Sequence, residues 1–411
     1  MFKTSIDNFR SRFHTKLRLV GLISTTIFFL AIFNSITAYL APIIMLDSGM
    51  SEMTMGLIYS SSSFFGFILD FVLAKVLKST NYKRMLIYTI IAASLFPISM
   101  LVGQNVIFYI LGMLFWGLYS NLWGFAYYDF AAREAKVAFH ATSLSLLFIF
   151  LDLGDFIGML LAEPISNMDS NINILLILLA ILSLSAVSLI LTYFIKSHST
   201  KSYEENHGNF NKIITVSKKL FPLLLFGTLL NIIEAVIWTI TPIVDRVAPQ
   251  INNYGGILLA VSIVPSFFTN LIIQRIDTKK NKKRIALVSF IIGSLLLAML
   301  GLTTTVAQYF ILTFLYSTCF AIVYPMLGGA FADYLSESKS YDNEILSSKD
   351  MFANIGYIIG PIVGTFLLTV TDSLYLFTYL GVSTAILALI LYFIIPKRIP
   401  FKDRDLLNPA L

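Results

Sequence analysis

Four carboxylic acids stand out because each lies inside a long apolar segment: Asp70, Asp152, Asp155 and Glu234. No Lys or Arg falls in the middle of such a segment. A carboxylate in apolar surroundings is costly unless it is protonated, paired or hydrated. We therefore regard these acids as candidates to bind and release protons, with Glu234 first and the pair on the fifth segment second. For Asp70, a structural hydrogen bond to a neighbouring helix is an equally good interpretation.

Aromatic residues at helical spacing form a second candidate group. Trp116, Tyr119, Trp123 and Tyr127 follow one another at intervals that place them on one helix face. Rings beside carboxylates suit flat, lipophilic or cationic molecules through stacking and cation–π contact. Packing or anchoring at the membrane surface is the alternative explanation of such a stripe. The candidate substrate-binding set also includes Asn34, Trp238, Tyr316 and Tyr324.

Charged residues at the ends of apolar segments are candidates to gate access by pairing across the two halves of the chain. Asp129 and Arg133 are one helical turn apart, and Asp333 occupies a comparable place in the second half. Simple solvation of helix ends is the commoner explanation. The same set contains two basic pairs, Lys83 with Arg84 and Lys283 with Arg284.

The elements that position these residues are predicted from composition. The chain is 57% hydrophobic and 13% charged, so it carries more apolar surface than a soluble domain buries. Twelve predominantly apolar runs have the length of about 20 residues that crosses the hydrocarbon of a bilayer, the first over 18–45 and the seventh over 220–244. Open strands would leave backbone groups unpaired in lipid. We therefore predict an all-α polytopic membrane protein with twelve transmembrane helices.

The chain also repeats itself at an offset of 200 residues, and this repeat aligns Asn34 with Glu234 in sequence. Internal duplication predicts two pseudo-symmetric six-helix bundles, as in many carriers. We expect an N-terminal bundle over 1–195, a polar cytoplasmic linker over 196–219 and a C-terminal bundle over 220–411. The identities that carry the repeat are Pro42-Ile43, Gly56, Phe67, Asn81 and Lys83-Arg84, which recur as Pro242-Ile243, Gly256, Phe267, Asn281 and Lys283-Arg284.

Basic residues predict the orientation. All but one of the 29 Lys and Arg residues fall in segments on one side of the predicted bilayer, and Arg246 is the exception. The positive-inside rule then places both termini and the middle loop in the cytoplasm. The net charge of +6 is explained by topology and anionic lipid, so we expect no nucleic-acid partner. We expect a monomer in the plasma membrane, which would be the inner membrane of a prokaryote.

The sequence lacks the motifs of several classes of chemistry. The sequence has no GxxxxGK[ST] phosphate loop and no GxGxxG turn after a strand, so we expect neither nucleotide-driven pumping nor a cofactor. The single cysteine, Cys319, excludes an internal disulfide and gives no support for a metal cluster. The four histidines lie outside or at the edges of the spans. We do not expect an enzyme.

Taken together, two parallel halves of six spans and basic loops after the second and eighth spans resemble the major facilitator superfamily. The family's signature after the second helix is similar to G-x-L-a-D-r-x-G-r-[KR]. Here Ala74 replaces the first glycine, Lys78 the acid and Asn81 the second glycine, and Lys83-Arg84 retain the basic end. The resemblance implies that this loop latches the two halves together in one state of the cycle. In this chain the acid of that latch is replaced by Lys78. We expect Asn81 and Asn281 to adopt the left-handed turn geometry of glycine.

Glycines every four residues on the eleventh span, Gly356, Gly360 and Gly364, predict a seam where two helices approach closely. The run resembles the family's antiporter motif, although that motif belongs on the fifth span. There the sequence has Gly154 and Gly158. The resemblance thus extends to members of the drug/proton antiporter type.

These observations predict a secondary active carrier that works by alternating access between its halves. The preferred mechanism is proton-coupled efflux of small lipophilic or cationic compounds, in which proton and substrate compete for Glu234 and the fifth-span acids. The lack of intramembrane Lys or Arg argues against phosphate, nucleotide or carboxylate substrates. Two alternatives stay open: a proton symporter that imports a small neutral nutrient, and a membrane sensor that transports nothing.

Overall fold

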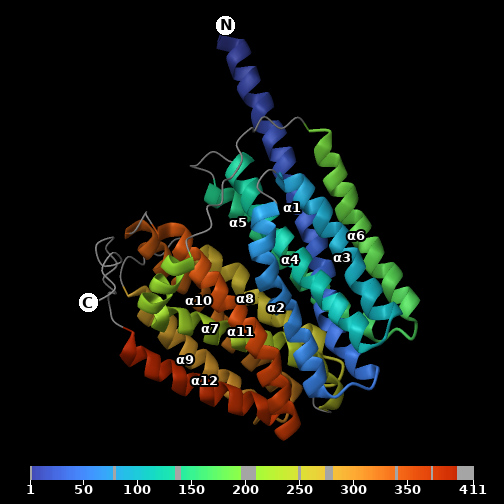
Figure 1. The fold of residues 1–411 in the computed structure, drawn as a ribbon, viewed down its shortest axis with the longest axis vertical. Coiled ribbons are helices and arrows are strands. Elements are labelled where there is room, and N and C mark those ends of the chain that lie inside the picture. The colour runs from blue at the N-terminus through green and yellow to red at the C-terminus, as the bar shows by residue number, and fades with distance from the viewer. Residues whose placement is uncertain are drawn as a thin grey trace. The chain divides into compact units, whose positions relative to one another are not determined.

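The computed structural model describes residues 2–76, 80–134, 140–195, 210–248, 251–273, 281–337, 341–371 and 374–395. The side chains of some helical residues beside the gaps, among them Asp70 and Arg133, also lie outside the described part. The described chain forms twelve α-helices (Figure 1): α1 (Phe2–Asp47), α2 (Glu52–Val76), α3 (Tyr82–Val102), α4 (Val106–Glu134), α5 (His140–Ser166), α6 (Asn171–Tyr193), α7 (Phe210–Val247), α8 (Gly255–Ile273), α9 (Lys282–Leu300), α10 (Val306–Glu337), α11 (Asp342–Val370) and α12 (Tyr375–Ile394).

The prediction of an all-helical fold with twelve helices is confirmed. Within the described residues, nine helices are long and apolar enough to cross a membrane, and α8 adds a shorter apolar stretch over Gly255–Thr269. Helix boundaries differ from the prediction mainly at the N-terminal ends of α1, α7 and α11, where the predicted spans began at 18, 220 and 351. The second of these begins at Phe210, so residues 210–219 of the expected linker are helical.

Contacts divide the chain into two compact units. The first unit consists of residues 1–40 and 68–204, and the second of residues 41–67 and 205–411. The end of α1 and the first part of α2 therefore pack with the C-terminal half, a division that sequence alone did not predict. The proposed domain bounds at 195 and 220 stay a prediction.

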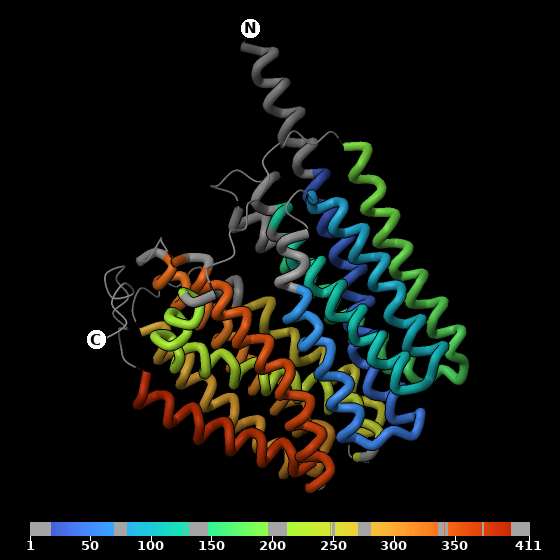
Figure 2. Tube along the Cα trace, viewed as in Figure 1, coloured from blue at the N-terminus to red at the C-terminus, as the bar shows by residue number. Residues whose placement is uncertain are grey.

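In the first unit, α1 is the central element. Ser185 and Ser188 of α6 donate hydrogen bonds to its backbone carbonyls at Thr26 and Leu22, at 3.0 and 2.9 Å. The helices α3 and α4, joined by a short turn, lie side by side (Figure 2). Because α1 is surrounded, its large side chains such as Phe33 are fully buried.

In the second unit, α7 takes the corresponding place. It packs extensively along α11, and α9 packs on both α10 and α12. Ser217 of α7 donates a hydrogen bond to Ser348 of α11 at 3.0 Å, and Thr228 donates to the Phe352 carbonyl at the same distance. Short polar side chains thus tie the two helices together along their length.

Arg246, which we expected to stand alone outside the membrane, forms an ion pair in the second unit. Its Nη1 lies 2.8 and 2.9 Å from the two carboxylate oxygens of Asp47 at the end of α1. Both side chains are partly exposed, at 36% and 60%. The pair therefore lies where solvent screens it.

The two asparagines of the degenerate signature differ. Asn281 has φ 67° and ψ 16°, the left-handed geometry that we predicted. The prediction for Asn81 is wrong: with φ −94° and ψ 161° it is extended, and its side chain accepts a hydrogen bond from the Arg84 backbone N–H at 3.0 Å. An asparagine that caps a helix N-terminus needs this extended backbone.

Candidate functional site

Glu234 lies at the junction of three helices in the second unit. The hydroxyl of Tyr324 on α10 donates a short hydrogen bond to its Oε2, and the hydroxyl of Tyr357 on α11 donates to the same oxygen at 2.8 Å. Hydrogen bonds of this kind to a carboxylate are among the stronger ones in proteins. The carboxylate thus connects α7 to two neighbouring helices within the membrane-spanning segment.

The two carboxylate oxygens of Glu234 differ. Oε2 accepts both phenols, whereas no residue of the described chain forms a hydrogen bond with Oε1. An ionised carboxylate has about four acceptor positions, so those of Oε1 are unused within the described chain and could take a proton or a donor from a ligand.

Accessible residues on α7 form a narrow stripe around this acid. Asn231, Glu234 and Trp238 are half-buried, while the residues between and after them are mostly buried. The spacing of three and four puts the stripe on one helix face. The predicted partner Trp238 therefore shares the face of Glu234, one turn further along.

Close packing of α11 on α7 positions Tyr357. A Cβ at the preceding residue, Gly356, would lie 2.7 Å from the Asn231 Cβ and 2.8 Å from the Thr228 carbonyl oxygen. No side chain fits there without displacing the helix. The predicted glycine seam is confirmed, and it brings the phenol of α11 within reach of the acid on α7.

In the first unit, Asn34 corresponds to Glu234 at the 200-residue offset, and aromatic donors bind it. Its Oδ1 accepts hydrogen bonds from Trp116 Nε1 at 3.3 Å and from the Tyr119 hydroxyl at 2.9 Å, both on α4. Phe96 of α3 packs on both rings, with centroid distances of 5.3 and 6.3 Å. Two members of the predicted aromatic stripe thus join Asn34 in one cluster.

The other two members lie further along α4. Tyr127 packs edge-on against Phe148 of α5, at a centroid distance of 5.8 Å. Trp123 is 8% exposed, and its indole N–H has no hydrogen-bond partner in the described part of the chain. The stripe is therefore continuous on one face but differs in its partners.

The acids of α5 lie beside α1. The Ser35 hydroxyl donates a hydrogen bond to Asp155 Oδ1 at 2.5 Å, and Asp152 is half-buried one turn earlier. Between these helices a Cβ at Gly158 would lie 2.7 Å from the Ile32 carbonyl oxygen. This seam repeats that of α11 on α7, so Asp155 has a structural contact in addition to its candidate role.

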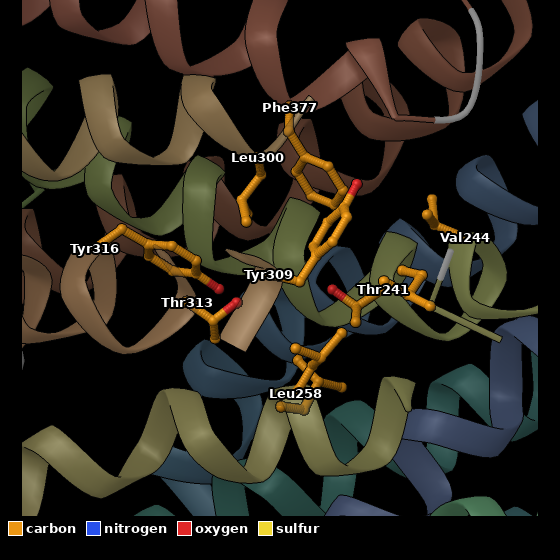
Figure 3. A pocket seen from close by; sticks show the side chains of 10 residues that line it. Thr241, Val244, Leu258, Leu300, Tyr309, Thr313, Tyr316 and Phe377 are labelled. Carbon is orange, nitrogen blue, oxygen red and sulfur yellow. The ribbon is translucent and has the colours of Figure 1, made fainter. Parts of the chain in front are cut away.

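Tyr316 lies elsewhere in the second unit, at a small cavity of about 20 Å³ (Figure 3). This volume holds about one water. Figure 3 shows its hydroxyl pointing toward that of Thr313, with Thr241 of α7 opposite. The structure therefore brings Tyr324, and not Tyr316, to Glu234.

The first unit's candidate gating residues bind neighbouring helix ends. Lys83, which is 7% exposed, donates to the Thr192 carbonyl at the end of α6 at 2.7 Å. Asp129 is buried and accepts the Tyr82 backbone N–H at 2.9 Å, at the start of α3. Arg84 is exposed. These contacts stabilise helix termini, and gating stays a prediction.

The second unit's candidates behave similarly. Asp333 is exposed and pairs with Lys282 at 2.7 Å. Lys283 donates to the Tyr334 hydroxyl at 2.9 Å, and Arg284 lies over the Tyr392 ring at 5.9 Å from its centroid. Each contact joins α9 to a helix of its own unit. The side chains of Asp70 and Arg133 lie outside the described residues, so their roles also stay predictions.

Sequence reasoning missed Tyr357 as a site residue. It lies inside the glycine run, directly after Gly356, in a segment that we interpreted only as packing. Its phenol is the one polar group in the run Gly356–Gly364. A tyrosine on a tight helix seam could have been recognised as a donor to the facing helix.

Comparison with known proteins is consistent with this geometry. Residues 256–409 match the sequence profile described as Major Facilitator Superfamily. The crystal structure of the nucleoside transporter NupG superposes with a TM-score of 0.69 at 15% identity, over 92% of this chain and 98% of that one. The chain has the major facilitator fold.

Other structures with the major facilitator fold are similarly close. A POT family transporter in complex with 5-aminolevulinic acid gives a TM-score of 0.72 at 13% identity, over 92% of this chain and 96% of that one. The E. coli fucose:proton symporter FucP gives 0.62 at 15% identity, over 92% and 98%. No curated protein matches the chain in sequence. These three structures are described as a nucleoside transporter, a POT family transporter and a fucose:proton symporter.

Proposed function

We propose that this protein is a secondary active transporter in which Glu234 exchanges a proton for substrate. The observation that carries the proposal is the arrangement of the carboxylate of this half-buried residue, with two phenols on Oε2 and no hydrogen-bond partner in the described chain on Oε1. A proton on Oε1 removes the charge that the two phenols stabilise. Binding or release of that proton therefore changes the ties between α7, α10 and α11.

The preferred substrates are small lipophilic or cationic compounds, moved out of the cell. Glu234 offers a negative charge beside the rings of Tyr324, Tyr357 and Trp238, which suits a cation with an apolar body. The acids of α5 provide a second place for the same competition. We propose the plasma membrane, with both termini cytoplasmic and the chain acting as a monomer.

Flux into proteoliposomes tests the proposal. We expect a pH gradient to drive tetraphenylphosphonium against its concentration gradient in vesicles that contain the wild-type protein. Glu234→Gln retains the shape and the acceptor for both phenols but cannot ionise, so it should abolish the response to the gradient while the protein still folds.

The control is Asp169→Asn, which removes a carboxylate from the exposed connection between α5 and α6. It should retain wild-type flux. If Glu234→Gln retained pH-driven flux, the coupling role of Glu234 would be wrong.

Import by proton symport is the second candidate, and one observation favours it. A structure that shares the fold over most of both chains is described as a fucose:proton symporter. Under symport, a pH gradient of the opposite sign should drive accumulation of a neutral sugar or nucleoside, and the lipophilic cation should not move. Absence of flux for all of these solutes under both gradients would leave the sensor alternative.

A further inference from the structure

We propose that Asn34 is a substrate-binding residue of the first unit that presents its amide N–H2, so that the transported compound carries a hydrogen-bond acceptor such as a carbonyl. The inference rests on the proposed transport function and adds to it the chemistry that the first unit recognises. It depends on how α4 orients one carboxamide.

The orientation of the Asn34 side chain is fixed by its partners. The indole N–H of Trp116 can only donate, so the group that faces it is the amide oxygen. The Tyr119 hydroxyl donates to the same oxygen, and the two bonds occupy both of its lone pairs. The amide nitrogen therefore points away from α4 with both hydrogens available.

No residue of the described chain accepts a hydrogen bond from that nitrogen. The accessible surface of α1 coincides with this point: from Leu30 to Leu40 every residue is buried except Asn34, which is half-buried. The half-buried side chain of Asn34 is thus the one break in the buried stretch from Leu30 to Leu40. Because polar groups within the membrane normally find partners, a donor left open here indicates a ligand.

Aromatic residues complete the surroundings of the amide. Phe96 and Trp116 lie at 5.3 Å between centroids, and Phe33 packs edge-on to Tyr119 at 6.1 Å. A molecule with a hydrogen-bond acceptor on its rim matches the amide donor beside these rings, whereas a molecule with donors only does not.

The test compares two cations that differ by one carbonyl, phenyltrimethylammonium and its 4-acetyl analogue, by calorimetry on the protein in lipid nanodiscs. One additional hydrogen bond predicts that the acetyl compound binds the wild type about fivefold more tightly. Asn34→Asp keeps the acceptor for α4 but replaces the N–H2 by an oxygen, so the preference should vanish or reverse. Asn173→Asp, the same change at an exposed position of α6, should retain it.

Trp116→Phe provides a second variant in case Asn34→Asp does not fold. It removes the donor that fixes the orientation, so the preference should fall to about twofold as the amide becomes free to rotate. Equal affinity of the two cations for the wild type, including absence of binding, would overturn the inference, as would a full preference in Asn34→Asp. Glu234→Gln should leave the ratio of the two cations' affinities unchanged. Failure of this inference is therefore distinguishable from failure of the coupling proposal.

Discussion

Replacing Gly356 by alanine should separate the packing of α11 from its role in the site. The new Cβ would lie 2.7 Å from the Asn231 Cβ and 2.8 Å from the Thr228 carbonyl oxygen, where ordinary contacts begin at 3.4 Å. Because one contact is backbone, α11 must move away from α7 by roughly half an ångström, at a cost of about 1–3 kcal/mol. The adjacent Tyr357 moves with it and weakens its 2.8 Å hydrogen bond to Glu234.

The matched control is Gly328→Ala on α10, where nothing lies within 4 Å of the added Cβ. There alanine should stabilise the helix by up to about 1 kcal/mol. The expected gap between the free energies of unfolding of the two variants is therefore about 1–4 kcal/mol, measurable by titration with SDS in mixed micelles. We also expect Gly356→Ala to slow pH-driven flux more than the control does. Equal unfolding midpoints for the two variants would refute the close contact of α7 with α11.

Three further predictions follow from individual contacts. Asp129→Ala should lower the stability by about 1–2 kcal/mol in the same titration, because the first N–H of α3 loses its acceptor, and a smaller loss in Asp129→Asn would support this cause. A double-mutant cycle on Asp47 and Arg246 should give about 1 kcal/mol or less, falling as salt is added; a larger, salt-independent value would contradict solvent screening of the pair. Tyr357→Phe removes one donor and should reduce pH-driven flux with little loss of expression, whereas wild-type flux would show that the phenol is dispensable.

Sequence predicted the fold well because its signals were local. Apolar runs of transmembrane length, turn residues and basic loops each depend on neighbouring residues alone. The 200-residue repeat even aligned Asn34 with Glu234, and both prove to be acceptors for aromatic donors on the fourth helix of their half of the chain, α4 and α10. The glycine seam on α11 could also be predicted, because residues spaced four apart in a helix lie on the same face.

What sequence could not predict depends on contacts across helices. Tyr316 and Tyr324 are two turns apart on α10 and equally good candidates by type, yet only the second reaches Glu234. Asn81 and Asn281 occupy equivalent places and differ in backbone geometry. The boundary between the two units inside α1 and α2 is also invisible in a continuous helical pattern.

The single open oxygen of Glu234 has a consequence for the energetics of a transport cycle. If Glu234 is the single site of exchange, it accommodates one proton or one monovalent cation, but not both, so their exchange moves no net charge. Such a cycle is electroneutral and gains nothing from the electrical potential across the bilayer, which is worth about 2.3 kcal/mol per elementary charge at 100 mV. Only the chemical gradient of protons would then set how far the substrate can be concentrated.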